Sequence, residues 1–86
     1  MRIDFTKDFD KQFAKLSRPK QLRAKAALAL YLEDPSALIL RLHRLKGEWA
    51  GYCSMSAGGD LRLHFLAITP NTLLFVAIGT HSQLYK

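Results

Sequence analysis

The sequence predicts an α+β domain, in which an antiparallel sheet carries a two-helix hairpin on one face. The pattern of apolar residues between residues 6 and 33 predicts two consecutive helices, of which the first is amphipathic. Residues 61–66 instead alternate between apolar and polar side chains, and residues 72–78 form an uncharged β-rich run, so the second half predicts strands. An N-terminal strand, two helices and a three-stranded meander together form an α+β fold.

The first helix is expected from Thr6 to Leu16, after a short edge strand over Arg2 to Phe5. Phe9, Phe13 and Leu16 follow Phe5 at intervals of three or four residues and mark one apolar face. The Thr6 hydroxyl is suited to accept an early backbone N–H and cap the helix.

A second helix is expected from Lys20 to Glu33, with Pro19 in its first turn and Asp34-Pro35 after its end. Its second half is apolar on almost every side and is expected to pack on the sheet. The segment from Leu38 to Leu45 is either a strand or an extended lead-in to one. In either case Arg41 and His43 are expected on the same side of the chain.

A β-hairpin is predicted between Leu45 and Phe65, with a turn at Ala57-Gly58-Gly59-Asp60 where two glycines tolerate positive φ. The period of two places Leu61, Leu63 and Phe65 on one face, and Arg62 and His64 on the other. Trp49 opens the hairpin and is expected to be structural. The uncharged run from Thr72 to Ile78 predicts an inner strand, which Gly79-Thr80-His81 ends before a short tail. The expected core contains Phe9, Phe13, Leu30, Leu63, Phe65 and Phe75.

Composition bounds the classes of protein to be considered. The 86 residues form one domain, residues 1–86, with a net charge of +6 and a pI near 9.8, which favours a polyanionic or acidic partner. Eleven of the thirteen basic residues precede Gly47, so this charge is uneven. The single cysteine, Cys53, excludes an internal disulfide and fits a reducing cytoplasm. We expect no secretory signal, no membrane segment and no zinc site.

An unusual group of polar residues follows the predicted strands: His43, Asp60, Arg62, His64, His81 and Tyr85. Each residue alone has an ordinary structural explanation, such as a turn aspartate or an exposed strand arginine. Together they are the groups needed to cleave RNA without a metal or other cofactor: a base, a cation and an acid. Histidine serves both proton roles, because its unperturbed pKa is about 6.5.

Three blocks of the chain resemble the RelE/ParE toxin superfamily, and most closely its YafQ-like branch. They run from His43 to Tyr52 (HRLKGEWAGY), from Gly59 to Leu63 (GDLRL) and from Gly79 to Tyr85 (GTHSQLY). The resemblance covers essentially the whole chain, including the helical hairpin. It implies the toxin of a bacterial type II toxin–antitoxin system, a ribosome-dependent endoribonuclease that cuts mRNA. It also implies that the partners are a cognate antitoxin, the ribosome with its mRNA, and operator DNA bound through the antitoxin complex.

The resemblance implies catalytic roles for His43, Asp60 and His81. It places Arg62 at the position of a phosphate-binding arginine and Tyr85 at that of a C-terminal aromatic. With these two residues we expect Arg41, His64 and Lys46 to contact RNA.

Two positions depart from the YafQ-like pattern: Ser56 stands where that pattern has histidine, and Ala77 where it has arginine. These departures leave two alternatives open. One is a degenerate toxin that retains only antitoxin binding and operator repression. The other is a ParE-type inhibitor of DNA gyrase, a class that lacks the histidine set.

Overall fold

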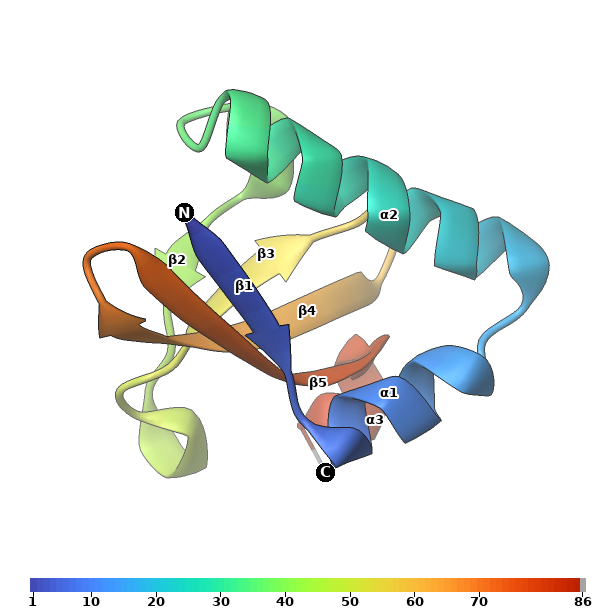
Figure 1. Ribbon diagram of the computed structural model, residues 1–86. Coiled ribbons are helices and arrows are strands. Elements are labelled where there is room, and N and C mark those ends of the chain that lie inside the picture. Colours follow the sequence, from blue (N-terminus) through green and yellow to red (C-terminus); the bar gives the residue numbers. More distant parts are fainter. Residues whose placement is uncertain (86) are drawn as a thin grey trace.

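A five-stranded mixed sheet forms the centre of the computed structural model, which describes residues 1–85 (Figure 1). Its strands lie in the order β1-β5-β4-β3-β2. The strands are β1 (Arg2–Phe5), β2 (His43–Arg44), β3 (Cys53–Ser56), β4 (Leu61–Thr69) and β5 (Thr72–Thr80). The helices are α1 (Lys7–Ala14), α2 (Arg18–Glu33) and α3 (His81–Leu84), with 3-10 turns η1 (Leu38–Leu40) and η2 (Gly47–Trp49).

Strand pairing confirms the predicted sheet with one correction. Strands β2 to β5 form antiparallel pairs in sequence order, and β1 occupies the predicted edge. However, β1 runs parallel to β5, with Arg2 opposite Thr72 and Phe5 opposite Phe75. A parallel pair needs a long crossover connection, which the helices and the three preceding strands supply here.

α1 begins directly after Thr6, as predicted, but ends at Ala14 and not at Leu16. α2 begins at Arg18, two residues before the predicted start at Lys20. Thr6 caps α1, because its hydroxyl accepts the Phe9 backbone N–H at 3.1 Å. Ser17 precedes α2, and Pro19 lies in its first turn. α1 also bonds directly to the sheet, since the side-chain oxygen of Gln12 accepts the Ile78 N–H at 2.9 Å. This pair of helices therefore covers one face of the sheet (Figure 1).

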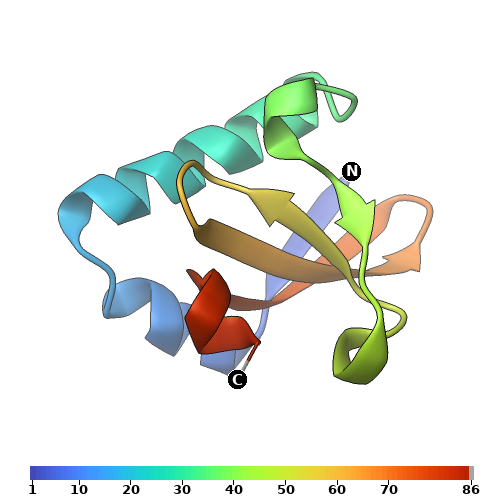
Figure 2. The same cartoon turned by 180° about the vertical axis from the view of Figure 1, so that it is seen from behind.

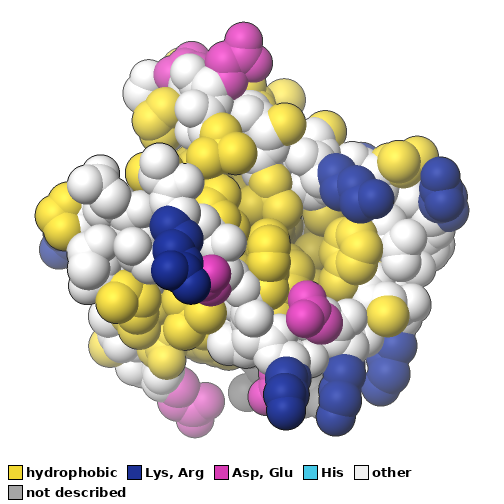
Figure 3. All heavy atoms as spheres, viewed as in Figure 1, with side chains coloured by type: hydrophobic (Ala, Val, Ile, Leu, Met, Phe, Trp, Pro, Cys, Tyr) yellow, Lys and Arg dark blue, Asp and Glu magenta, His cyan; other side chains and the backbone are white. Residues whose placement is uncertain are grey.

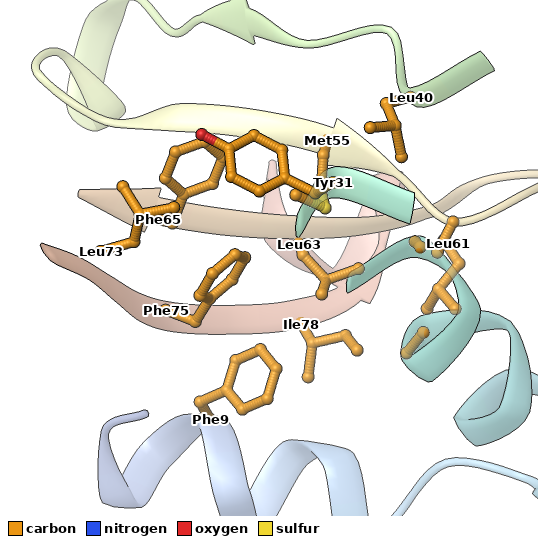
Figure 4. Packing of buried hydrophobic residues seen from close by; sticks show 13 residues of the cluster. Phe9, Tyr31, Leu40, Met55, Leu61, Leu63, Phe65, Leu73, Phe75 and Ile78 are labelled. Atoms are coloured by element: carbon orange, nitrogen blue, oxygen red, sulfur yellow. The ribbon is translucent and has the colours of Figure 1, made fainter. Parts of the chain in front are cut away.

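The core lies between that helical pair and the sheet (Figure 4). Phe9, Leu63, Phe65 and Phe75 are buried there as predicted, while Phe13 and Leu30 are partly buried against the same cluster. The Tyr31 ring of α2 packs edge-on against Phe65 at a centroid distance of 5.8 Å. Because alternate residues of a strand face opposite sides, Arg62 and His64 face away from the helices, as predicted.

Two segments differ from the prediction. Residues 38–45 form η1 and the two-residue β2 instead of a continuous strand, because Arg41 adopts a left-handed conformation with φ of 48°. Gly79 and Thr80 continue β5, and the expected tail forms α3. Thr80 and Gln83 cap this helix reciprocally in a capping box. No helix of residues 1–85 is long and apolar enough to cross a membrane.

The two faces of the sheet are covered differently. Figure 3 shows hydrophobic side chains exposed at the centre of the helical face. An apolar groove of about 210 Å³ lies there between α1, α2 and β1, lined by Phe5, Phe9, Asp10, Phe13, Lys25 and Leu28. In the reverse view of Figure 2, the short α3 lies in front of the strands. Arg62 and His64 lie on this second face, which points away from α1 and α2.

Candidate functional site

A row of four residues crosses the second face of the sheet at one level. His43 of β2 is the register partner of Ser54, Ser54 is the partner of His64, and His64 is the partner of Ala77. Cross-strand partners point to the same side of a sheet, and neighbouring strands lie about 4.8 Å apart. His43 and His64 are therefore separated by about two strand spacings, with a serine between them.

A second row lies two residues nearer the β3–β4 turn and contains Ser56, Arg62 and Gly79. Nη1 of Arg62 donates to the Ser56 hydroxyl at 3.2 Å and to the carbonyls of Gly59 at 2.8 Å and Leu61 at 3.0 Å. These bonds hold the guanidinium over the turn. Within residues 1–85 the only ion pair joins Arg2 and Asp4, so no carboxylate in this range neutralises Arg62.

Asp60 and His81 meet at the end of these rows. Asp60 lies just before β4, His81 opens α3 directly after β5, and the His81 backbone N–H donates to the Asp60 carbonyl at 2.9 Å. Both side chains are exposed. The structure therefore brings together two of the three residues expected to be catalytic, with Arg62 two positions further along the strand.

The helix α3 then folds back across the sheet, so that Tyr85 reaches the first row. The Tyr85 hydroxyl lies 3.2 Å from Nε2 of His64, and its ring lies 4.4 Å from the His81 ring, centroid to centroid. Trp49 closes the other side of His64 with its ring edge-on at 4.4 Å. Its indole N–H donates to the Leu84 carbonyl at 3.1 Å.

Burial distinguishes His64 from the other two histidines. Its side chain is 0% exposed, whereas His43 and His81 are exposed. Desolvation by burial, together with smaller contributions from the nearby His43 and His81, lowers the pKa of His64 to about 4. The expected contact of His64 with RNA is therefore wrong, because a fully covered neutral imidazole offers no surface to a ribose or a phosphate.

The remaining predicted residues lie on the β2 side. Nδ1 of His43 is 2.8 Å from the Arg41 carbonyl, which ties the ring to its own segment. Arg41 and Lys46 are exposed on either side of β2, but Arg41 lies outside the strand, so the strand alternation that was to align it with His43 does not apply. His43 faces the same side of the sheet as His64 but comes from the edge strand β2, two strands away from β4.

Both departures from the family pattern lie inside this site. Ala77 is buried beside His64 in the first row, and Ser56 is bonded to Arg62 in the second. Ala77 is the register partner of His64, so a longer side chain at residue 77 would point to the same side of the sheet as the buried imidazole. The small residue at 77 thus accompanies the dense aromatic packing around His64.

This arrangement supplies exposed imidazole, carboxylate and guanidinium groups around one end of the sheet. In residues 1–85, no three His, Cys, Asp or Glu side chains lie close enough to hold a metal ion together. The sequence reasoning missed the burial of His64 and its bond to Tyr85. A signal was present, because buried Tyr and Trp side chains usually find hydrogen-bond partners.

Comparison with known proteins addresses the fold. No family profile matches the sequence, and no curated protein matches it. Among solved structures, Escherichia coli YafQ is similar over 100% of both chains, with 24% identity and a TM-score of 0.80. The E. coli DinJ–YafQ toxin–antitoxin complex is similar over 98% of this chain and 96% of that chain, with 24% identity and a TM-score of 0.76. A metal-bound toxin from Helicobacter pylori is similar over 99% of both chains, with 28% identity and a TM-score of 0.69.

Proposed function

We propose, on the premise that this chain has the fold of the YafQ-like toxins of the RelE/ParE superfamily, that it is the toxin of a type II toxin–antitoxin system. Its activity in this proposal is ribosome-dependent endonucleolytic cleavage of mRNA, without a metal. One observation carries the proposal beyond the fold. The exposed Asp60 and His81 are joined by a 2.9 Å backbone hydrogen bond, beside a guanidinium that no carboxylate in residues 1–85 neutralises.

The chemistry requires a proton to leave the ribose 2′-OH and another to reach the departing 5′-oxygen. The 2′-oxygen attacks the adjacent phosphorus, the bond from phosphorus to the 5′-oxygen breaks, and a 2′,3′-cyclic phosphate and a 5′-OH remain. We assign His81 as the acid or base nearest the scissile phosphate, because it is exposed and positioned by β5. Asp60 and His43 share the other proton transfer.

Arg62 is the proposed phosphate ligand. Its Nη1 is occupied by the turn, but the rest of the planar guanidinium keeps donors for a phosphate oxygen. A fixed cation stabilises the charge that develops on the phosphorane more effectively than a mobile one, because it need not reorganise during the reaction. Arg41, Lys46 and Tyr85 extend the proposed RNA-binding surface.

The two departures favour a second candidate, a degenerate toxin that binds its antitoxin and represses the operator without cutting RNA. Ala77 provides no guanidinium, and Nη1 of Arg62 is already shared among three acceptors. If the remaining donors of Arg62 do not reach the phosphate from the turn, the phosphate lacks its main cation. Cleavage measurements discriminate between the two candidates.

A cognate antitoxin is the proposed protein partner, and the apolar groove between α1, α2 and β1 is suited to an amphipathic segment of it. The +6 charge favours an acidic segment. Ribosome and mRNA are the other proposed partners, with operator DNA reached through the antitoxin complex. Under this proposal the protein acts in the cytoplasm, where its substrate is.

The test is induction in bacteria at matched expression, with growth and mRNA 5′ ends followed together. The parent should arrest growth and produce new mRNA ends, and co-expression of the neighbouring antitoxin should prevent both. His81→Ala should lower cleavage by about 100- to 10,000-fold, the usual contribution of one proton-transfer group. Asp60→Ala, Arg62→Ala and His43→Ala should weaken it, while Glu33→Ala at the exposed end of α2 serves as the control.

The same variants and EDTA separate the alternatives. In a second assay the purified protein acts on ribosomes in EDTA, and polyamines replace Mg²⁺ to keep the ribosomes intact. Cleavage of mRNA should persist under these conditions. Growth arrest by His81→Ala with parental mRNA ends would refute the assignment of His81. Arrest without new mRNA ends would direct attention to gyrase, and neither arrest nor ends would favour the degenerate toxin.

A further inference from the structure

We infer that His64 is a positioning residue of this site, whose buried imidazole anchors the Tyr85 hydroxyl and thereby holds the Tyr85 ring against His81. The inference rests on the proposed function and adds to it a residue that the nuclease chemistry itself does not require. It is carried by a chain of three contacts: His64 Nε2 to Tyr85 Oη at 3.2 Å, the Tyr85 ring to the His81 ring at 4.4 Å, and the Trp49 ring to His64 at 4.4 Å.

A histidine at position 64 is unfavourable for the stability of the sheet. His64 lies on a central strand, 0% exposed, between Leu63 and Phe65. Its Nδ1 and the hydroxyl of its cross-strand partner Ser54 are both buried without a protein hydrogen-bond partner in residues 1–85. A buried polar atom without a partner destabilises a fold, so an apolar side chain would make a more stable sheet. A purely structural role does not explain an imidazole here.

The imidazole of His64 provides a hydrogen-bond partner for the Tyr85 hydroxyl. A neutral imidazole carries one donor and one acceptor nitrogen, and a phenol hydroxyl can complement either one. Within residues 1–85, only Nε2 of the two nitrogens has a partner, and that partner is Tyr85. The hydroxyl is thus tied to a group that itself cannot move, because Trp49 and the neighbouring strands enclose the ring.

The helix α3, which carries His81, needs contacts with the rest of the protein to be stable. The helix α3 has four residues, and a single helical turn is not stable in isolation. Its orientation therefore depends on contacts with the sheet. These include the Trp49 indole N–H to the Leu84 carbonyl and the bond from Tyr85 to His64. The second of these fixes the ring that contacts His81, so it governs the orientation of the imidazole as well as the path of the backbone.

The experiment compares two substitutions at the buried position. His64→Gln places an amide group near the position of Nε2 and can still bond to Tyr85, whereas His64→Phe fills the space with an apolar ring and cannot. If His64 only filled the core, Phe would be tolerated better than Gln. If it anchors Tyr85, Gln retains cleavage, and Phe loses it even where it folds well.

Tyr85→Phe breaks the same bond from the outside without altering the strand, and Tyr52→Phe is the matched control. Tyr52 packs on the Trp49 ring at 5.4 Å and makes no contact with His64 through its hydroxyl in residues 1–85. Single-turnover cleavage on programmed ribosomes is measured over a range of ribosome concentrations. His64→Phe and Tyr85→Phe should lower the maximal rate by about 10- to 100-fold, the typical cost of a misplaced catalytic group, at an unchanged half-saturating concentration.

A spectroscopic readout tests the positioning separately from the cleavage. The ring protons of His81 should carry a ring-current shift from Tyr85, measured by NMR of the folded protein. In His64→Phe and Tyr85→Phe the chemical shifts of the His81 ring protons should move toward those of a histidine in an unstructured peptide. In His64→Gln and Tyr52→Phe these shifts should keep their parental values. Thermal melting establishes that each variant is folded.

Parental His81 shifts and parental cleavage in both His64→Phe and Tyr85→Phe would overturn the inference. Equal loss in His64→Gln and His64→Phe, with Tyr85→Phe unaffected, would also overturn it, because the hydrogen bond would then not be the cause. If the parent itself cuts no RNA, the proposed function fails, but the His81 shifts still decide whether His64 positions that ring.

Discussion

A buried neutral imidazole makes the stability of this protein depend on pH. The pKa of His64 is lowered to about 4 in the folded state, mainly by burial, while an unfolded histidine titrates near its model value of 6.5. Below pH 6.5 the unfolded chain therefore binds a proton that the folded chain does not. The stabilisation is complete above about pH 6.5 and is lost as the pH falls toward about 4.

We therefore expect the melting temperature to fall progressively between about pH 6.5 and 4, beyond the slope caused by the carboxylates. His64→Phe should flatten this part of the profile, because it removes the titrating group. His43→Ala, at an exposed position, should retain most of the slope. Melting by circular dichroism at constant ionic strength measures it, and a parental slope in His64→Phe would contradict the explanation.

Trp49 illustrates a residue that is structural in two separate ways. Its ring contacts Tyr52 and His64, and its N–H bonds to the Leu84 carbonyl. Trp49→Ala should destabilise the fold by about 2–3 kcal/mol, less than for a fully buried tryptophan because the side chain is half-buried. For a domain of this size that lowers the melting temperature by roughly 10 °C or more.

Trp49→Phe separates the two contributions, because it keeps an aromatic ring but loses the donor to Leu84. It should cost about 1 kcal/mol, the usual net contribution of one hydrogen bond. Differential scanning calorimetry on both variants measures this order. An unchanged melting temperature in Trp49→Ala, with cleavage lost, would instead indicate that Trp49 stacks on RNA or on the ribosome.

At the scale of single residues, the alternation of β4 was enough to predict that Arg62 and His64 share a face. It was not enough to predict that one is partly accessible and the other completely covered. The difference arises from Trp49 and Tyr85, which approach His64 from positions 15 residues before and 21 residues after it in the chain. Periodicity records only the strand itself and contains no information on what packs above it.

The element on which the site depends most is the single turn of α3. Gly79 leaves room for the side chain that caps it, since a Cβ there would lie 2.9 Å from the Gln83 side-chain oxygen. That oxygen accepts the Thr80 backbone N–H at 2.8 Å. A glycine is needed at position 79 because it has no Cβ to displace Gln83, and not because the backbone has a positive φ there.

We expect Gly79→Ala to displace Gln83, loosen α3 and reduce cleavage without unfolding the sheet. Gln83→Ala should have a similar effect, because it removes the same cap from the other side. The double variant should be no worse than either single variant, since both act on one interaction. Melting curves and cleavage rates for the three variants test this, and additive losses would show that the two residues act independently.

At the scale of elements, the two long helices and the β3–β4 hairpin were predictable because each has a local signal: a cap, a proline, or paired glycines. The short β2 and α3 were not. Arg41 adopts a left-handed conformation, which could not be predicted because glycine and asparagine, the residues that favour it, are absent from this position. α3 has a local signal in the Thr80–Gln83 capping box, but its single turn also depends on tertiary contacts with residues 49 and 64, which the sequence does not show.

The charge of the whole molecule bears on its encounter with RNA. With a net charge of +6, binding to the ribosome should release counterions and weaken steeply with salt. The half-saturating ribosome concentration should therefore rise with KCl, while the maximal cleavage rate changes little. His81→Ala should bind with the parental salt dependence, because it leaves every lysine and arginine of the chain in place. Salt-insensitive binding in a filter or sedimentation assay would contradict this.

At this largest scale the α+β architecture was predictable from the order of elements, and the similarity of the known toxin structures confirms the fold. The reaction was not predictable to the same degree. Related folds host different targets, and the choice between them depends on a few side chains. Here Ala77 and Ser56 are the positions at which the pattern and the chain disagree.

The parallel pairing of β1 with β5 has a consequence for when the protein becomes active. Contacts such as that between Thr6 and Val76 join segments 70 residues apart, so the edge of the sheet cannot close until β5 is available. Folds with many distant contacts form slowly. On a translating ribosome, a chain that lacks β5 also lacks the strand that presents His81. Under the proposed function, synthesis itself therefore delays activity, and the ribosome that makes each copy is protected from it until β5 has emerged from the exit tunnel.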